Sequence, residues 1–302
     1  MKAGTSTGPE RYAESAEQDV PARGQAEVLN RIEHVVAIMS GKGGVGKSSV
    51  AALLAMAWRR AGKRVGLLDA DITGPSIPRM LGLKGQPAMS PLGIMPVKTA
   101  GGIQVMSINL LLEREDEAVI WRGPLIGSAI KQFWSDVYWG DLDMLVIDLP
   151  PGTADAPLTV MQSIPLSGVV MVTSPQDLAG MVVRKAAQMA CQLQVPIIGL
   201  LENMSYLACP SCGLHIDVFG PSQAERTAQA LGIPLLGRLG LDPRLAACCD
   251  EGSVEQYESD AVMAMAEQVL ALMPKEKAKP VFGAAAIRSE RRGEGDGKAG
   301  TP

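Results

Sequence analysis

The stretch SGKGGVGKSS at 40–49 has the composition and spacing of a loop that binds phosphate. It fits the pattern G-x-x-x-x-G-K-[ST], and its glycines let the backbone turn so that successive N–H groups face an anion. Lys47 supplies a positive charge for the β and γ phosphates, and the hydroxyl of Ser48 is a ligand for Mg²⁺. The stretch therefore predicts a nucleotide site with Mg²⁺. Its predicted members are Gly41, Lys42, Gly43, Gly44, Val45, Gly46, Lys47, Ser48 and Ser49.

Two further segments place carboxylates where a phosphate site needs them. The segment LLDADITGPSIPRMLG carries Asp69 and Asp71 directly after one apolar run, and MLVIDLPPGTADAPLTV carries Asp148 at the end of another. Carboxylates beside bound phosphates either hold Mg²⁺ or orient the attacking water. Asp148 is therefore predicted to bind Mg²⁺, directly or through water, whereas spacing alone does not divide these roles between Asp69 and Asp71. Thr153 and Asp155 lie where the γ-phosphate could be sensed.

Lys42 is a second lysine within the phosphate loop, at a position that ordinary phosphate loops do not require. It cannot easily join Lys47 around the same phosphates within one chain. We therefore predict that Lys42 reaches the nucleotide of a partner molecule. The alternative is a solvated side chain on an exposed turn, which is the usual place of a lysine.

The segment ENMSYLACPSCG places Cys209 and Cys212 three residues apart. This C-x-x-C pair brings two sulfur atoms to one centre, but tetrahedral zinc or a [4Fe–4S] cluster normally has four protein ligands. His215 is a candidate third ligand, although a lone histidine is more often a packing residue. Cys248 and Cys249 are further candidates, but adjacent cysteines seldom direct both sulfur atoms at one metal.

The C-x-x-C pair is also compatible with three further arrangements. It could be a thioredoxin-like redox pair, although such a pair opens a helix and this one lies in a loop. It could also be two inert thiols in a turn. Finally, a homodimer would bring two cysteines from each chain to one cluster on the two-fold axis. Lys42 independently requires the same kind of partner.

The elements that position these residues are predicted from short apolar runs separated by helix-like stretches. Apolar runs without alternation are typical of strands buried on both faces, as in a parallel sheet that helices cover. We predict an α/β fold of the P-loop NTPase type, with a doubly wound, mostly parallel sheet flanked by helices in a single domain at 30–273. Residues 1–29 and 274–302 have too little apolar surface to fold and are predicted to be disordered tails. The predicted strands lie at 35–39, 64–69, 103–108, 144–148, 168–173 and 196–201.

The composition of the chain argues against several classes of partner. Its 302 residues include 28 basic and 32 acidic side chains, a net charge of -4, so no global positive field attracts nucleic acid or an anionic membrane. No apolar run approaches the roughly 18 to 20 residues that span a bilayer, and no secretion signal is present. The five cysteines, an odd number, indicate reduced thiols. We predict a cytoplasmic protein that binds neither membrane nor nucleic acid.

The sequence KGGVGK resembles the deviant phosphate-loop signature of the superfamily that contains MinD, ParA, the nitrogenase iron protein and the Mrp/ApbC cluster carriers. ENMSY before CPSCG, together with LDADITGPSIPRMLG and IDLPPGTADAPLT, is similar to the Mrp/ApbC type over about 31–273. Two details depart from that family. Ser49 stands where a threonine is usual, and GRLGLDP replaces a proline-containing version of that segment.

This resemblance implies an ATP-dependent iron–sulfur cluster carrier that binds and hydrolyses ATP as a homodimer. In such a protein Lys42 acts across the dimer, on the nucleotide that the partner holds with its own Lys47. Asp71 matches the aspartate that positions the attacking water. Asn203 matches an asparagine that binds adenine through its amide, although an asparagine that forms a turn is an alternative.

The resemblance also implies that Cys209 and Cys212 of both chains hold one bridging [4Fe–4S] cluster per dimer. The cluster would come from a donor scaffold and pass to apo iron–sulfur proteins. Two alternatives stay open: a positioning ATPase of the MinD/ParA type, and a P-loop ATPase in which the same cysteines hold a structural zinc. The first needs an amphipathic C-terminal helix or a basic surface, whereas the C-terminal segment here has mixed charges interrupted by glycine and proline.

Overall fold

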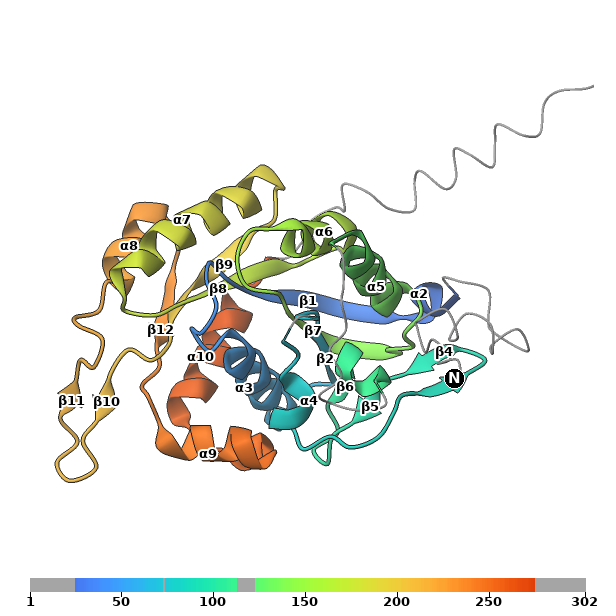
Figure 1. Cartoon of the computed structure of the whole chain (residues 1–302), viewed down its shortest axis with the longest axis horizontal. Helices are drawn as coiled ribbons and strands as arrows, with labels where there is room; N and C mark the ends of the chain where they lie inside the picture. Colours follow the sequence, from blue (N-terminus) through green and yellow to red (C-terminus); the bar gives the residue numbers. More distant parts are fainter. Residues whose placement is uncertain (1–24, 73, 113–122, 275–302) are drawn as a thin grey trace, which may run out of the picture.

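The computed structural model describes residues 25–72, 74–112 and 123–274. Their centre is an eight-stranded sheet in the order β12-β9-β8-β1-β7-β2-β6-β5 (Figure 1). Neighbouring strands are parallel except β5, which runs antiparallel to β6 at one edge. In chain order the strands are β1 (Arg31–Ser40), β2 (Val65–Asp69), β5 (Val97–Lys98), β6 (Gln104–Ser107), β7 (Asp141–Asp148), β8 (Gly168–Thr173), β9 (Ile197–Glu202) and β12 (Leu235–Arg238).

Two small antiparallel hairpins lie outside this sheet. One pairs β3 (Ala88–Ser90) with β4 (Gly93–Met95), and the other pairs β10 (Leu207–Ala208) with β11 (His215–Ile216). The second hairpin extends away from the body of the domain, beyond the end of β9 (Figure 1). It carries the C-x-x-C pair at its turn.

Helices cover both faces of the sheet, and the sheet separates the core into two layers (Figure 1). Successive side chains of β1 point to opposite faces, so that Val36 and Ile38 belong to one layer and Val35 and Ala37 to the other. The first layer packs against α3 (Lys47–Arg60), α4 (Ile77–Met80), α9 (Pro243–Glu251) and α10 (Asp260–Ala271), and the second against α5 (Gly123–Ser135), α6 (Asp155–Ser163), α7 (Asp177–Gln192) and α8 (Ala224–Leu231). The remaining helices are α2 (Gln25–Leu29) and the 3-10 helices η1 (Ile108–Leu111) and η2 (Val254–Gln256).

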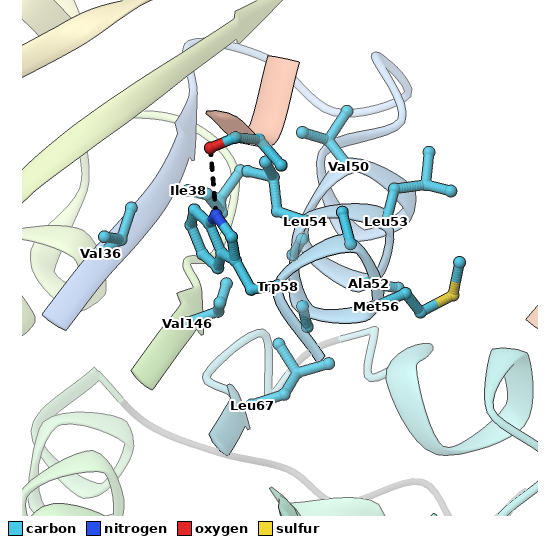
Figure 2. Packing of buried hydrophobic residues seen from close by; sticks show 14 of the residues in the cluster. Val36, Ile38, Val50, Ala52, Leu53, Leu54, Met56, Trp58, Leu67 and Val146 are labelled. Atoms are coloured by element: carbon cyan, nitrogen blue, oxygen red, sulfur yellow. Dashed lines mark hydrogen bonds between the residues drawn. The ribbon is translucent and has the colours of Figure 1, made fainter. Parts of the chain in front are cut away.

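Helix α3 directly follows the phosphate loop and is buried along most of its length. Its sequence is rich in alanine and leucine, which favour helix and give it apolar surface on several sides. Trp58 is 1% exposed and donates from Nε1 to the carbonyl of Ala266 in α10 at 3.1 Å (Figure 2). Packing between the sheet and α10 therefore fixes α3, and α3 in turn fixes the loop at its N-terminus.

The structure confirms the predicted fold class. Each of the six predicted apolar runs coincides with a strand, although β1 begins earlier, at Arg31. The sequence does not predict β12 or β5, because β12 (LLGR) contains only two consecutive apolar residues and β5 has only two residues in all. The prediction that residues 1–29 form a disordered tail is wrong for residues 25–29, because Gln25–Leu29 form α2 and Ala26 is buried. The rest of that tail, 1–24, and most of the C-terminal one, 275–302, lie outside the described residues.

The parallel strands bring the candidate residues to one edge of the sheet. β1 leads into the phosphate loop, β2 ends at Asp69, β7 ends at Asp148, and β9 leads to Asn203. In open α/β sheets this carboxyl edge is where ligands bind. Among the described residues, no helix is long and apolar enough to cross a membrane.

Candidate functional site

The phosphate loop borders a cavity of about 390 Å³ at the carboxyl edge of the sheet. Gly44 and Gly46 have φ values of 77° and 76°, in the left-handed region that glycine adopts without strain. A side chain at Gly46 would also have no room, because its Cβ would lie 2.3 Å from Nδ2 of Asn203. The predicted loop members that line the cavity are Lys42, Gly43, Gly44, Gly46, Lys47, Ser48 and Ser49.

Lys47 is buried at the base of this cavity with two carboxylates. Its Nζ lies 2.6 Å from Oδ1 of Asp148 and 3.8 Å from Oδ2 of Asp71, and it is 3.4 Å from the hydroxyl of Ser48. Lys47 is 6% exposed and Asp148 is fully buried. A cation in so dry a place attracts anions strongly, because little water screens it. The arrangement fits the binding of phosphate oxygens by Lys47.

Asp148 has one oxygen that no protein group satisfies. Its Oδ2 is the one buried side-chain nitrogen or oxygen of the described residues that has no hydrogen-bond partner. Burial raises the pKa of Asp148, whereas Lys47 and a hydrogen bond with Ser48 lower it. A buried acceptor without a donor is costly. This oxygen without a partner therefore fits a divalent cation or one of the waters that such a cation carries.

The structure separates the two aspartates that spacing alone could not separate. Asp69 is completely buried, and its carboxylate accepts hydrogen bonds from the backbone N–H groups of Asp71 and Ile77 and from the hydroxyl of Ser107. Burial, together with the nearby Asp148, raises the pKa of Asp69 to about 8. Asp71 instead lines the cavity. Through these hydrogen bonds Asp69 holds the backbone at Asp71 and Ile77 in place. Asp71 faces the cavity, where chemistry would occur.

Asn203 lies directly beneath the phosphate loop. It is 7% exposed, and its Nδ2 donates to the carbonyl of Val45 at 2.9 Å, while its own N–H donates to the carbonyl of Thr173. The side-chain amide therefore connects the loop to the end of β9. The amide oxygen takes no part in this contact with the loop, so the predicted contact with adenine can use an atom other than the one that binds Val45.

Lys42 lines the same cavity as Lys47 but contacts a different part of the chain. Its Nζ donates to Oε1 of Gln176, in the connection between β8 and α7. Lys42 is half-buried and Gln176 is exposed. Within one chain, Lys42 is thus engaged by a neutral side chain. The predicted contact of Lys42 with the nucleotide of a partner would require this hydrogen bond to break.

The hairpin that carries the cysteines has an ordered turn. The N–H of Cys209 donates to the carbonyl of Leu214, and the N–H of Gly213 donates to the carbonyl of Cys209, both at 2.8 Å. Cys209 is half-buried and Cys212 is exposed. Hydrogen bonds from the backbone N–H groups of Ser211 and Cys212 lower the pKa of the Cys209 thiol. The turn therefore favours the thiolate, which is the form that binds metal.

The base of the hairpin is held by a stacked pair of rings. The ring centroids of Tyr206 and His215 are 3.8 Å apart with an angle of 16° between the planes. Below them the hydroxyl of Ser205 donates to Glu202 at 2.5 Å and accepts from Nε of Arg238 at 2.8 Å. His215 is exposed, and its ring stacks on that of Tyr206.

Cys248 and Cys249 lie on α9, apart from the hairpin. Cys249 lines the phosphate cavity, together with Arg79 and Asp250, and the sequence contains no signal that points to these three. Their place depends on α9 packing against α4, a long-range contact. Thr153 and Asp155 do not line the cavity. In the described parts of the chain, no group of three or more histidine, cysteine, aspartate or glutamate side chains is placed to hold a metal ion.

Known protein families and relatives match most of this chain. The family model described as "ParA: NUBPL iron-transfer P-loop NTPase" matches residues 31–273. The iron-sulfur cluster carrier protein of Methanocaldococcus jannaschii is 49% identical over 239 residues, which cover 78% of this chain and 81% of that protein. The protein of the same name from Clostridium perfringens is 44% identical and covers 76% of this chain and 83% of its own length.

Solved structures are similar to this chain as well. A nucleotide-binding protein in complex with ADP from Archaeoglobus fulgidus is 47% identical, with a TM-score of 0.69 over 76% of this chain and 90% of that one. The cell division ATPase MinD of Pyrococcus furiosus is 22% identical with a TM-score of 0.56 over 80% of this chain and 99% of that one, a likeness that concerns the fold alone. The chain therefore belongs to the family of NUBPL iron-transfer P-loop NTPases within the ParA group.

Proposed function

We propose that this protein is an ATP-dependent carrier that receives an iron–sulfur cluster, holds it between two copies of the chain and passes it to apo iron–sulfur proteins. The observation that carries the proposal is the hairpin with Cys209 and Cys212, two free thiols on a turn that extends from a domain with a phosphate loop. Relatives that are 44% to 49% identical are named iron-sulfur cluster carriers. A donor scaffold would supply the cluster in the cytoplasm, where thiols stay reduced.

The number of thiolates favours a homodimer. One chain offers two cysteine ligands on the hairpin, whereas a [4Fe–4S] cluster takes four. A second copy related by a two-fold axis supplies two more of the same kind. The phosphate loop follows β1 and the hairpin follows β9 at the same edge of the sheet, so one partner can meet both. Lys42 at this edge would then reach the nucleotide of the partner.

The nucleotide site is proposed to hydrolyse ATP. Lys47 would bind the β and γ phosphates, and Ser48 and Asp148 would hold Mg²⁺, directly or through water. Asp71 would orient the attacking water, since its carboxylate faces the cavity. The positive charge of Lys42 from the partner would stabilise the charge that develops on the γ-phosphate. Hydrolysis would relax the segment around Asp71 and change how the two chains meet.

Metal analysis tests this function most directly. Anaerobically reconstituted protein should hold about four iron atoms per dimer and absorb in the visible region through thiolate-to-iron charge transfer. Purified protein that contains zinc at the same stoichiometry, and no iron after reconstitution, would support a structural zinc instead. A protein that pellets with liposomes or DNA only when ATP is present would indicate a positioning ATPase of the MinD type.

The contact between Lys42 and Gln176 predicts two opposite effects. Gln176→Glu replaces the neutral amide acceptor of Lys42 by a carboxylate and so creates an exposed ion pair, which should hold Lys42 within its own chain. We expect the protein concentration for half-maximal ATP hydrolysis to rise by up to about fivefold, because an exposed pair contributes at most about 1 kcal/mol. Gln176→Ala should lower that concentration. The measurement is ATP hydrolysis as a function of protein concentration.

Gln192→Glu is the matched control for this prediction. It adds the same charge at the far end of α7, where it does not contact Lys42. Its ATP hydrolysis should follow the wild-type concentration dependence. If Gln176→Glu and Gln176→Ala shift the curve in the same direction, the contact does not restrain Lys42.

Asn203 provides a prediction on nucleotide preference. Asn203→Ala removes the amide that supports Val45 and that we propose to contact adenine. One hydrogen bond contributes about 0.5 to 1.5 kcal/mol, so the Kd for ATP should rise roughly threefold to tenfold. Titration of ATP and GTP separates the two roles. Loss of the preference for ATP over GTP supports base recognition, whereas an equal loss for both nucleotides means that Asn203 only supports the loop.

A further inference from the structure

The returning side of the hairpin carries a group of exposed apolar side chains. Leu214 is 68% exposed, Ile216 46%, Val218 47% and Phe219 40%. These four residues, which we call the apolar stripe, lie within six consecutive positions. Isolated apolar residues are common on protein surfaces, but a contiguous group of large ones marks an interaction site. The stripe therefore needs a partner that covers it.

Two residues of the stripe, Leu214 and Ile216, flank His215 in the returning strand of the hairpin. His215 stacks on Tyr206 at the base of the hairpin, so its side chain is satisfied within the chain. Alternate residues of an extended strand point to opposite faces. Leu214 and Ile216, which flank His215, therefore point away from Tyr206 and towards solvent. No side chain of the hairpin covers them, as their exposure shows.

The chain segment that contains the stripe carries almost no charge. From Asn203 to Ser222 the chain has one charged residue, Asp217. A surface of low charge is removed from water at low cost, whereas charged groups oppose burial. It can also meet an identical surface without repulsion between like charges. This matters only for a partner of the same sequence, because an isologous interface brings the same patch from both sides.

The stripe is continuous with the cysteines. The carbonyl of Leu214 accepts a hydrogen bond from the N–H of Cys209 at 2.8 Å, so the stripe begins next to one sulfur ligand. Four thiolates that share one cluster must approach within a few ångströms of it. Two hairpins that meet at their cysteines therefore also bring their stripes together. A recipient protein must also reach the cluster, but only during transfer, whereas a second copy that supplies two of the four thiolates stays in contact for as long as the cluster is bound.

We infer that the apolar stripe is the surface through which two copies of this chain meet around the shared cluster. The inference rests on the proposed function and names the partner of the same site: a second copy of this chain. Burial of the stripe excludes water from the cluster and holds the two pairs of cysteines at a fixed separation. The phosphate loop supplies a contact between the two copies that depends on nucleotide. The stripe supplies an apolar contact between them that does not require complementary charges.

Two substitutions that place opposite charges at the same position of the stripe test the inference. Leu214→Asp and Leu214→Lys are expected to weaken self-association in the presence of a non-hydrolysable ATP analogue by at least about tenfold, because each places like charges at the contact and removes apolar burial from both copies. An equimolar mixture of the two variants should associate more strongly than either alone. The measurement is sedimentation of cluster-free protein, followed by iron content after anaerobic reconstitution.

Met89→Asp is the matched control. Met89 is also highly exposed, at 63%, but lies in β3, far along the chain from the hairpin. The same change there should leave self-association and iron content as in the wild type. Both positions are exposed, so that the variants should fold, which ATP-analogue binding by each single variant verifies.

Two results would overturn the inference. If Leu214→Asp and Leu214→Lys associate as the wild type does, or if their mixture gains nothing, the stripe is not a contact between copies. If both variants dimerise and hold iron but no longer transfer it to an apo acceptor, the stripe contacts the recipient instead. In either case the cluster-carrier function stands. Failure of the wild type to bind iron would contradict the proposed function itself.

Discussion

Lys47→Met is expected to reduce ATP hydrolysis by at least roughly 100-fold. The lysine is the buried cation at the base of the phosphate cavity, where its charge acts with little screening by water. Removal of a single group that stabilises transition-state charge costs about 10²- to 10³-fold in other enzymes. Nucleotide affinity should fall as well, because the same charge binds the β and γ phosphates before the reaction. Steady-state phosphate release and ATP titration measure the two effects.

The same substitution should destabilise the nucleotide-free protein. Lys47→Met leaves Asp148, which is fully buried, without the cation that lies 2.6 Å from its Oδ1. Loss of one partner of a buried ion pair costs about 3 to 5 kcal/mol. The loss is limited here, since burial already raises the pKa of Asp148 and the carboxyl can take up a proton. Chemical denaturation without nucleotide measures the free energy of unfolding.

A double variant separates catalysis from stability. In Lys47→Met/Asp148→Asn the buried position carries no charge, so much of the free energy of unfolding should return, while hydrolysis stays abolished. Lys63→Met, which removes the same charge from an exposed position after α3, should change neither property. If the double variant unfolds as easily as Lys47→Met, the buried ion pair is not the cause of the instability. Wild-type hydrolysis by Lys47→Met would exclude the phosphate-loop assignment.

The parts of the site that the sequence predicts are those encoded by adjacent residues. The phosphate loop lies between a strand and a helix, so its pattern and its setting occur in one stretch of chain. Asp148 is predictable for the same reason, as the last residue of an apolar strand. Parallel strands then bring such strand ends together. Local pattern and topology together are sufficient for this half of the site.

The parts that the sequence does not predict depend on contacts between distant residues. Asp69 and Asp71 look alike in sequence, and what separates them is a hydrogen bond from Ser107 in a different strand. Cys249 reaches the cavity because α9 packs closely on α4. This approach requires glycine, since a Cβ at Gly82 would lie 2.4 Å from the carbonyl oxygen of Gly252. No periodicity or motif indicates such a contact.

The hairpin shows a third kind of limit. The spacing of Cys209 and Cys212 is visible in the sequence, and the structure shows the turn that presents them. The described residues nevertheless contain no group of three or more histidine, cysteine, aspartate or glutamate side chains placed to hold a metal ion. Under the proposed function, the missing half of the ligand set comes from a second copy of the chain. Neither the sequence nor the fold of one chain contains it, and only counting of ligands indicates it.

Cys209→Ala and Cys212→Ala are each expected to abolish stable binding of iron while ATP binding remains as in the wild type. Each substitution removes two of the four thiolates of the dimer, one from each copy, so the cluster is left with half of its protein ligands. Both side chains lie on the hairpin, outside the residues that line the phosphate cavity. Iron and sulfide content after anaerobic reconstitution, together with ATP titration, measures both properties.

Cys191→Ala and Cys248→Ala are the matched controls, because they remove a thiol of the same chain that lies on α7 or α9 and not on the hairpin. Both should reconstitute about four iron atoms per dimer, as the wild type does. Retention of iron by Cys209→Ala and Cys212→Ala alike would show that the cluster lies elsewhere. Loss of iron in Cys248→Ala would place α9 among the ligands, against the expectation that adjacent cysteines do not share one metal.

A mixed dimer tests the bridge itself. Wild-type chains and chains that carry both Cys209→Ala and Cys212→Ala receive different tags and are combined. The mixed dimers, which carry both tags, are purified with an ATP analogue bound. A bridging cluster needs both hairpins, so mixed dimers should hold no stable cluster even though one copy keeps both thiols. If each copy binds its own metal with its own two cysteines, mixed dimers should hold half of the wild-type amount. The iron content of the mixed dimer therefore distinguishes one shared centre from two separate ones, which no variant of a homogeneous dimer can do.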